Sequence, residues 1–600
     1  MDDPRDILSH VFGFSDYRPG QQAIVEAVLA GEDVLAIMPT GGGKSLCYQL
    51  PALARGGLTL VVSPLIALMR DQVAALRRNG VEAGSLSSAN DDEERSRVAE
   101  AVREGRLRLL YASPERLANA ATLDWLSRCK VGLLAIDEAH CVSQWGHDFR
   151  PEYALLGDVR QKLGNVQTMA LTATADLPTR EDIEKRLFAK PPRLFIHGFD
   201  RPNIRLAMRA KDNAKRQVLD FVERHRGQSG IVYCASRKET ETFAEVLSER
   251  GFNAYAYHAG LDANVRSANQ DAFLREDGVV MAATVAFGMG IDKPDVRFVA
   301  HAALPKSIEA YYQEIGRAGR DGLPADTLTL YGLDDIRLRR RQIEEGDASE
   351  NQKRVERQRL NALISLAEAP RCRRQTLLAY FAEASEPCGR CDLCEGGVTV
   401  FDGTVEAQKI LSAVIRTGER FGAEHLVSVL MGEETEAILR AGHESLKTFG
   451  AGKDRPKAAW RSLIRQVYAL GLMQMDISAF GAFALTDRGW LVLKGQEKIE
   501  LRADTFAPRE TRKTRREKAA DAAGVSADDP LLAALKALRM QLAKAEQVPA
   551  YVVFSDKSLI DMALLKPRDL DGMRMVHGVG DAKLARYGEA FLEVVRKQQG

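Results

Sequence analysis

The segment MPTGGGKS at residues 38–45 has the residue types of a phosphate-binding loop. It follows the apolar run DVLAI, which is typical of a buried strand, and it leads into a helical pattern. Glycines let the backbone N–H groups face a polyphosphate, while Lys44 can reach its outer phosphates and the Ser45 hydroxyl can bind Mg²⁺. Met38 replaces the first glycine of the strict pattern, so the alternative is a chance glycine turn. The position between strand and helix favours a nucleoside triphosphate site.

An acidic sequence, DEAH at residues 137–140, is the second candidate for this chemistry. It follows the apolar run GLLAI, so we expect Asp137 at the carboxyl edge of a parallel sheet, where α/β proteins bind ligands. There Asp137 can hold Mg²⁺ through water, and Glu138 can orient and deprotonate an attacking water. Acidic pairs are common on protein surfaces. The prediction of a catalytic role therefore depends on the position of DEAH directly after a strand.

Two arginines further along the chain can complete such a site. Arg317 and Arg320 lie in YYQEIGRAGRDG, residues 311–322, and on a helical turn they face one side. If this turn meets the phosphate loop across a cleft, one guanidinium can neutralise charge developing on the γ-phosphate. The alternative is the solvated basic end of a helix.

Four of the eight cysteines form a cluster with the spacing C-x15-C-x2-C-x2-C: Cys372, Cys388, Cys391 and Cys394. The short spacings let thiolates converge on one tetrahedral ion, and four cysteines close its shell. We therefore predict a structural Zn²⁺ site, with a redox pair as the alternative. The other four cysteines lie in apolar segments and are typical of buried thiols in a reducing compartment.

Parallel sheets covered by helices are the scaffold that the sequence predicts for these residues. Short apolar runs alternate with amphipathic stretches, such as 66–79 and 91–104, from about residue 30 to residue 330. The runs are DVLAIM, LTLVVS, LRLLYA, GLLAID and TMALTA, then, after HGFDRPNIR at 197–205, GIVYCAS, AYAYHAG, GVVMAAT and VRFVAHA. This pattern predicts the α/β class, with two successive α/β domains.

Composition and charge limit the number of domains and the class of protein. A chain of 600 residues should hold several domains, and its 45% hydrophobic and 28% charged residues are ordinary for a globular protein. The net charge of +1 argues neither for nor against nucleic acid. No apolar run is long enough to span a membrane and the N-terminus lacks an apolar secretory core, so we expect a cytoplasmic protein.

The ordered motifs of the chain resemble those of superfamily 2 helicases of the RecQ family. They are YRPGQ (17–21), MPTGGGKS, SPLIALMRDQ (63–72), DEAH, ALTATA (170–175), ATVAFGMGIDKP (283–294) and QEIGRAGRDG. The resemblance implies two RecA-like domains that use ATP, Mg²⁺ and structural Zn²⁺ to unwind DNA in the 3′→5′ direction. It further implies roles in DNA repair, recombination and the SOS response, and a nucleoid-associated location. Its implied partners are single-stranded and duplex DNA, single-stranded DNA-binding protein and topoisomerase.

Site roles carried over from the family concern nucleotide and DNA. Gln21 would read the adenine edge, while Phe14, where relatives often have tyrosine, and Arg18 would sandwich the base. Arg320 would be the principal arginine finger, with Arg317 beside it. The full expected ATP set is Phe14, Arg18, Gln21, Thr40, Gly41, Gly43, Lys44 and Ser45, with Ser45 and Asp137 on Mg²⁺.

The loop SQWGHDFRPEY, residues 143–153, resembles the family's aromatic-rich loop, which senses single-stranded DNA and reports to the ATPase. Trp145 and Phe149 can stack on bases, Arg150 can pair with phosphate, and His147 can link loop to nucleotide. The alternative is that the aromatic rings only fill a cleft.

The remaining segments resemble the family's accessory domains. We expect RecA-like domains at 1–204 and 205–335, a zinc-binding subdomain at 336–400, a winged-helix domain at 401–502, a linker at 503–527 and a helical HRDC bundle at 528–600. A helix at 456–470 with Trp460, Arg461 and Arg465 is expected to lie on duplex DNA. Phe480, near the tip of a hairpin, is the candidate strand-separating wedge, and Tyr551 is expected to contact single-stranded DNA.

Two other functions stay open at this point. One is an RNA-stimulated helicase, which comparison of DNA and RNA strands would distinguish. The other is a zinc and winged-helix DNA-binding protein whose ATP site acts only as a switch, which a Glu138→Gln variant that still unwinds DNA would support.

Overall fold

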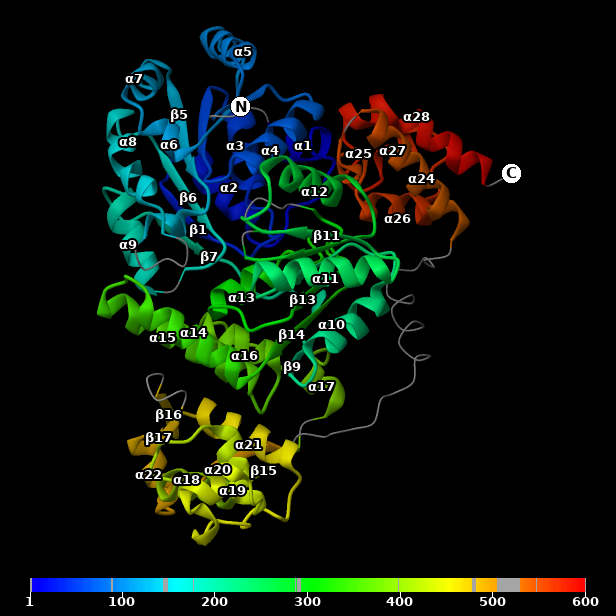
Figure 1. Cartoon of the computed structure of the whole chain (residues 1–600). Helices are drawn as coiled ribbons and strands as arrows, with labels where there is room; N and C mark the ends of the chain where they lie inside the picture. The colour runs from blue at the N-terminus through cyan, green and yellow to red at the C-terminus, as the bar shows by residue number, and fades with distance from the viewer. Residues whose placement is uncertain are drawn as a thin grey trace.

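The computed structural model describes residues 3–87, 90–143, 149–175, 177–285, 287–288, 293–397, 399–476, 482–503, 529–546 and 548–598. In these ranges two parallel sheets carry the N-terminal half of the chain, and smaller units complete the C-terminal half (Figure 1). No helix in the described ranges is long and apolar enough to cross a bilayer.

The first lobe is built on a seven-stranded sheet with the order β3-β4-β2-β5-β6-β1-β7, in which every pair is parallel. Its strands are β1 Val34–Ile37, β2 Leu58–Val62, β3 Ala83–Leu86, β4 Leu109–Ala112, β5 Val131–Ile136, β6 Thr168–Thr172 and β7 Arg193–Ile196. Its helices are α1 Pro4–His10, α2 Gln21–Leu29, α3 Leu46–Arg55, α4 Ile66–Arg78, α5 Asp92–Arg103, α6 Pro114–Leu117, α7 Ala120–Arg128, α8 Leu156–Lys162 and α9 Leu177–Leu187, with 3₁₀ turns η1 Ala139–Val142 and η2 Pro151–Leu155.

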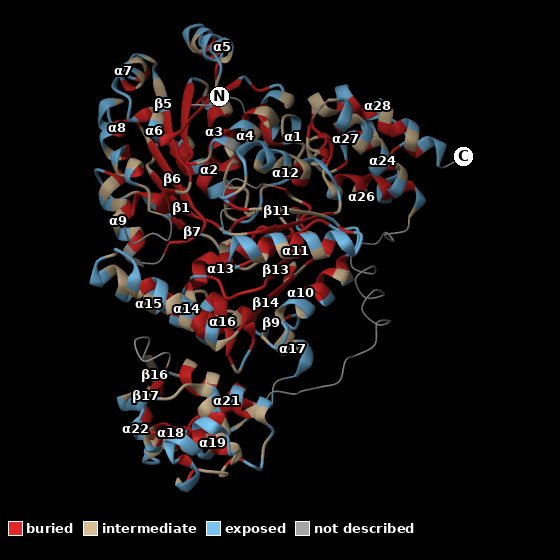
Figure 2. Ribbon diagram, viewed as in Figure 1, coloured by how far each residue is buried: buried red, intermediate tan, exposed pale blue. Residues whose placement is uncertain are grey.

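Both faces of this sheet are covered, which explains the apolar runs. Leu35 and Ile37 belong to one core cluster, whereas Val34 and Ala36, which point the other way, belong to a second. Figure 2 shows these strands as buried, with exposed residues mainly on the outer helices. The predicted α/β class is therefore confirmed.

The second lobe repeats the design with the strand order β11-β12-β10-β13-β14-β8, and β9 pairs with β14. Its strands are β8 Ile204–Arg205, β9 Met208–Ala210, β10 Gly230–Tyr233, β11 Asn253–Tyr257, β12 Val279–Ala283, β13 Phe298–His301 and β14 Ala325–Tyr331. Its helices are α10 Ala214–Val222, α11 Arg237–Glu249, α12 Ala263–Arg275 and α13 Ile308–Ile315, with the 3₁₀ turn η3 Glu223–His225.

A helical region and a small hairpin-bearing unit follow the second lobe. The helical region holds α14 Leu333–Glu345, α15 Glu350–Ala367, α16 Arg373–Tyr380 and α17 Asp392–Gly396. The small unit holds β15 Thr399–Asp402, α18 Thr404–Arg416, α19 Ala423–Met431, α20 Glu436–Ala441, η4 His443–Ser445, α21 Lys457–Ala469, β16 Met473–Asp476, β17 Ala482–Leu485, α22 Asp487–Leu493 and β18 Glu500–Ala503. The antiparallel β16–β17 pair forms the predicted hairpin. Phe480 and most of the predicted linker lie outside the described residues.

The C-terminal module has its own core and docks on both lobes (Figure 1). It contains α24 Pro530–Ala545, α25 Ala550–Val553, α26 Asp556–Leu565, α27 Leu570–Arg574 and α28 Asp581–Lys597. The backbone N–H of Gly578 donates to the carbonyl of Gly13 in the first lobe at 2.7 Å. Arg539, which is almost fully buried, pairs with Asp277 of the second lobe at 3.1 Å. The module therefore bridges the two lobes.

Candidate nucleotide site, zinc centre and DNA contacts

A cavity of about 610 Å³ lies between the two lobes. It lies where the phosphate loop leaves β1 and the acidic pair leaves β5, two strands separated only by β6. All twelve residues predicted for nucleotide binding and catalysis line it: Phe14, Arg18, Gln21, Thr40, Gly41, Gly43, Lys44, Ser45, Asp137, Glu138, Arg317 and Arg320. The structure thus brings together residues as far apart in the sequence as Phe14 and Arg320.

Hydrogen bonds from Gln21, which is itself bonded to Arg18, fix the backbone of the phosphate loop. The Gln21 amide donates to the carbonyls of Gly42 at 3.2 Å and Gly43 at 3.1 Å, and its oxygen accepts from the Arg18 backbone N–H at 2.8 Å. Gly43 has φ +77°, and a Cβ there would lie 2.4 Å from the Gln21 amide nitrogen, so this position requires glycine. Helix α3 begins directly after the loop, and a helix N-terminus in this position favours the binding of phosphate.

The acidic pair lies at the end of β5, as predicted. The backbone N–H of Asp137 donates to the carbonyl of Val62 at 2.9 Å, which extends the β5–β2 ladder by one residue. Glu138 has a left-handed backbone with φ +49°, a conformation that costs free energy for a residue other than glycine. The turn after the strand therefore fixes Glu138 in the wall of the cavity.

His140 connects this turn to the neighbouring strand. Its Nδ1 lies 2.9 Å from the Thr172 hydroxyl on β6 and 3.4 Å from a Glu138 carboxylate oxygen. Burial, with a smaller effect from Lys44, lowers the pKa of His140 to about 3. The ring is therefore neutral at physiological pH, and its hydrogen bond is to the Thr172 hydroxyl while the Glu138 carboxylate lies beside it.

The two arginines come from the turn that follows α13. Arg317 is buried and donates to the carbonyl of Gly288, and both guanidinium groups line the cavity. This turn touches the phosphate loop, because a Cβ on Gly316 would lie 3.0 Å from the Cβ of Thr40. The turn that carries the arginines therefore lies against the phosphate loop, and both border the same cavity.

The C-terminal module adds three residues to the cavity wall that the sequence did not place there: Tyr551, Lys557 and His577. The rings of His577 and Phe14 have centroids 5.4 Å apart. Tyr551, expected on a DNA surface, faces the nucleotide cavity in the docked module. No local pattern signals this arrangement, because it depends on how a separate unit docks.

Docking of the module should weaken as the pH falls. Burial, then the charge of Lys557, lowers the pKa of His577 to about 4, and Arg18 and Asp561 also face the ring. Release removes Phe14 and Arg18 from this environment while Lys557 stays in the module, so the pKa rises from about 4 part of the way toward the usual 6.5. Because the docked pKa is the lower one, docking is fully stabilised above about pH 6.5 and loses stability as the pH falls toward 4.

Energy transfer between dyes on the first lobe and the module should therefore decrease between pH 7.5 and pH 5. His577→Phe keeps an aromatic ring without a titrating group and should lose most of this dependence. An unchanged pH profile in that variant would show that another group controls docking.

The aromatic loop is described only at its ends. The Arg150 backbone N–H donates to the carbonyl of Cys141 at 3.0 Å, and its guanidinium donates to the carbonyl of Pro64 at 3.1 Å. Phe149 is half-buried, and Trp145 and His147 lie outside the described residues. The C-terminal end of the loop is thus attached to the turn that carries DEAH.

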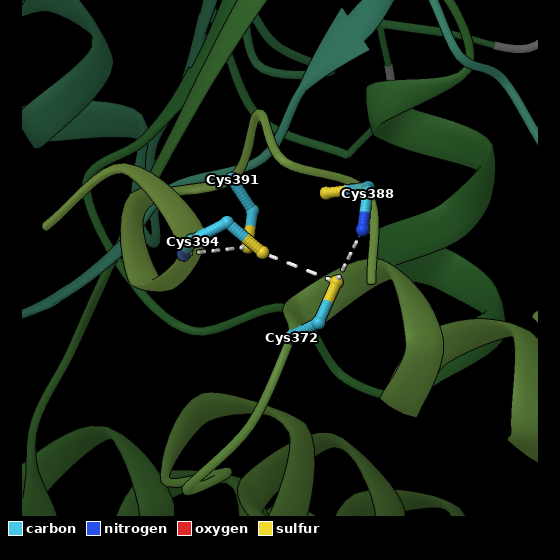
Figure 3. A group of neighbouring side chains, drawn as sticks. All are labelled: Cys372, Cys388, Cys391 and Cys394. Atoms are coloured by element: carbon cyan, nitrogen blue, oxygen red, sulfur yellow. Dashed lines mark hydrogen bonds between the residues drawn. The ribbon is translucent and has the colours of Figure 1, made fainter. Parts of the chain in front are cut away.

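The zinc cysteines converge as predicted. Their four Sγ atoms all lie within 4.8 Å of one another. Backbone N–H groups of Cys388 and Cys394 donate to the Sγ atoms of Cys372 and Cys391 at 3.3 and 3.4 Å (Figure 3). Such N–H···S bonds stabilise thiolates, and four sulfur ligands leave no position for a substrate, so the residues fit structural zinc.

Loss of a zinc ligand should unfold this region. Zinc sites of this type contribute about 10 kcal/mol or more to folding of small units. Cys391→Ser should therefore abolish stoichiometric zinc and make residues 336–400 sensitive to protease at temperatures where the wild type resists. Cys129→Ser, in the first lobe, is the matched control and should retain zinc. Retention of zinc and protease resistance by Cys391→Ser would contradict a four-cysteine site.

Two of the three residues named for the DNA contact of helix α21 are engaged within the protein. Trp460 is fully buried, and its indole N–H donates to the carbonyl of Gly452 at 2.7 Å. Arg465 pairs with Glu368 of α15 at 2.7 Å, and Arg461 pairs with Glu424. Arg465 is thus committed to the zinc-bearing region, whereas contact of α21 with DNA through the half-exposed Arg461 stays a prediction.

Two parallel α/β lobes around a phosphate loop, an acidic pair and paired arginines define the class of two-lobed, nucleotide-driven helicases. Family models match almost the whole chain: DEAD/DEAH box helicase at 18–183, Helicase conserved C-terminal domain at 212–322, RecQ zinc-binding at 333–395, RQC domain at 397–510 and HRDC domain at 528–595.

Relatives match over the same length. The ATP-dependent DNA helicase RecQ of Haemophilus influenzae is 43% identical over 597 residues, which cover 99% of this chain and 96% of the relative. The protein of that name from Bacillus subtilis is 37% identical over 593 residues, with 98% of each chain covered. The chain therefore belongs to the RecQ family of helicases, which confirms the resemblance, the RecA-like lobes and the use of ATP, Mg²⁺ and Zn²⁺.

Proposed function

We infer that this chain, a RecQ-family ATP-dependent DNA helicase, hydrolyses ATP in the cavity between its lobes and thereby moves 3′→5′ along single-stranded DNA. One observation carries the site assignment: all twelve predicted residues, drawn from both lobes, line one cavity. A site divided between two lobes changes when the lobes open or close, which is what a motor requires.

The proposed roles follow from position and chemistry. Lys44 and the loop amides bind the outer phosphates, and Phe14, Arg18 and Gln21 bind the adenine. Gln21 now bonds to the phosphate loop, so its bond to adenine would require a local rearrangement. Ser45 and Asp137 would hold Mg²⁺, which neutralises phosphate charge when bound.

Hydrolysis itself falls to Glu138 and the arginines. The Glu138 carboxylate takes a proton from the attacking water, and neutral His140 lies 3.4 Å from the carboxylate. Arg320, with Arg317 beside it, stabilises the negative charge that develops on the γ-phosphate oxygens. Because these arginines belong to the second lobe, catalysis is fastest when the lobes are closed.

The DNA contacts are the second part of the proposal. The aromatic loop would bind the strand through Trp145, His147, Phe149 and Arg150. Binding would then shift Glu138, because the loop is attached to the same turn. Phe480 would separate the first base pair. The zinc cysteines hold the region that connects the second lobe to the winged-helix unit.

The remaining expectations stay proposals. We propose the domain divisions at 1–204, 205–335, 336–400, 401–502, 503–527 and 528–600. Single-stranded DNA-binding protein and topoisomerase are proposed partners. The cytoplasm, in association with the nucleoid, is the proposed location, and repair, recombination and the SOS response are the proposed settings.

Unwinding of tailed duplexes tests the function. Duplexes with a 3′ tail should be unwound in the presence of ATP and Mg²⁺, and those with a 5′ tail should not. Unwinding from the 5′ tail alone would overturn the polarity, and ATP binding without any unwinding would favour a nucleotide-switched DNA-binding protein.

A further inference from the structure

Arg201 connects the two halves of the catalytic site. It lies in the segment between β7 and β8 that joins the lobes, and its guanidinium donates to four backbone carbonyls. One nitrogen bonds to Thr40 of the phosphate loop and, at 3.2 Å, to Gly316. The other bonds to Ala318 and Gly319, each at 2.9 Å. One side chain thus holds the phosphate loop of the first lobe against the arginine turn of the second.

The bonded carbonyls surround the catalytic arginines in sequence. Arg317 lies between Gly316 and Ala318, and Arg320 directly follows Gly319. Fixing these three carbonyls therefore fixes the direction in which both arginine side chains leave the backbone. Arginine suits this task because its planar fork presents several donors at once, whereas lysine has one compact ammonium. Burial lowers the pKa of Arg201 to about 10, which leaves it protonated at pH 7.

The segment that carries Arg201 is itself anchored on the zinc-bearing region. Asp200 pairs with Arg374 of α16 at 3.3 Å, and the Phe199 backbone N–H donates to Glu383 at 2.5 Å. Asn203 strengthens the other end of the connection, because its amide donates to the carbonyl of Gly319 at 2.8 Å. Arg374 lies two residues after the zinc ligand Cys372, so a continuous set of contacts joins the zinc centre to the arginine turn.

We propose that Arg201 is a positioning residue for ATP hydrolysis, which sets the distance between the phosphate loop and the turn carrying Arg317 and Arg320. It acts through these residues, because it is not among the residues that line the nucleotide cavity. The inference rests on the catalytic role proposed for Arg320. Its physical basis is that a displacement of about 1 Å of a catalytic group can cost about 100-fold in rate.

Arg160 provides a matched control for the ordinary cost of losing a buried arginine. It is buried in the first lobe, donates to the carbonyls of Val166 and Leu187 at 3.2 Å each, and pairs with Asp33 at 2.6 Å. It does not line the cavity. A purely structural role for Arg201 predicts that Arg201→Lys and Arg160→Lys behave alike.

The test is steady-state ATP hydrolysis by the full chain with saturating single-stranded DNA, together with KM for ATP, DNA affinity and Tm. Arg201→Lys should lower kcat by about 10- to 100-fold, with KM for ATP and DNA affinity changed less than threefold, whereas Arg160→Lys should leave kcat unchanged. If Arg201→Lys lowers Tm more than Arg160→Lys does, kcat is calculated per molecule that binds nucleotide, so that unfolded protein is not counted. A wild-type kcat on that basis overturns the inference.

A double variant separates this inference from the role of Arg320. If Arg201 acts through the turn, Arg201→Lys should cause little further loss in an Arg320→Ala background. If Arg201→Lys lowers kcat by the same factor in the Arg320→Ala background as in the wild type, the two residues act independently and the inference is overturned. If Arg320→Ala alone keeps wild-type kcat, the finger assignment fails, and the kcat of Arg201→Lys still decides whether Arg201 positions the turn.

Discussion

Replacing Arg320 by alanine should lower kcat for DNA-stimulated ATP hydrolysis by about 10³-fold or more, the usual worth of an arginine finger. The reason is geometric, because its turn packs against the phosphate loop and its guanidinium lines the nucleotide cavity. KM for ATP should change little, since the charge that Arg320 stabilises develops only in the transition state. Steady-state kinetics at saturating DNA measure both constants.

Two further variants sharpen the Arg320 result. Arg320→Lys should recover only part of the rate, because an ammonium cannot reproduce the planar fork. Arg250→Ala removes an exposed arginine of the second lobe and should be silent. A kcat within a few-fold of wild type for Arg320→Ala would move the catalytic role to Arg317 or away from this turn.

Replacing Glu138 by glutamine should lower kcat by about 10²- to 10⁴-fold, the range for loss of a general base. The amide keeps the shape of the carboxylate but cannot accept the proton of the attacking water. Binding of ATP should persist, because the phosphate loop is untouched, and titration with a fluorescent ATP analogue would show it.

Glu115→Gln, at an exposed position of the same lobe, is the matched control and should behave as wild type. Duplex unwinding should disappear together with hydrolysis in Glu138→Gln. A variant that no longer hydrolyses ATP and still unwinds DNA would instead support the nucleotide-switched binding protein.

The sequence predicted most of the apolar strands and missed strands in which polar residues interrupt the apolar run. Strands such as β1 and β2 are apolar throughout because helices cover both faces of their sheet. Strand β7 lies at the sheet edge with three of its four residues exposed, and β14 alternates threonine and leucine, so neither forms a simple apolar run. Burial does not explain both cases, because β14 is buried and paired on both sides, and it is its threonines that interrupt the apolar run.

The site followed a similar rule. Phosphate-loop, acidic and zinc residues were predictable because their chemistry fixes both residue type and spacing. Arg201 was not, because it binds backbone carbonyls, which leave no signature at the partner positions. His577 and Lys557 depend on how a separate module docks, and Arg465 was assigned to DNA because a basic helix face does not reveal Glu368 opposite it.

Coupling of the nucleotide cavity to a DNA strand is tested by the rate of ATP hydrolysis by the wild-type chain with single-stranded DNA, with single-stranded RNA and with neither. We expect slow hydrolysis without nucleic acid, strong stimulation by DNA and much weaker stimulation by RNA. Equal stimulation by RNA would make RNA a substrate, and a rate that ignores both strands would contradict the coupling of this cavity to nucleic acid.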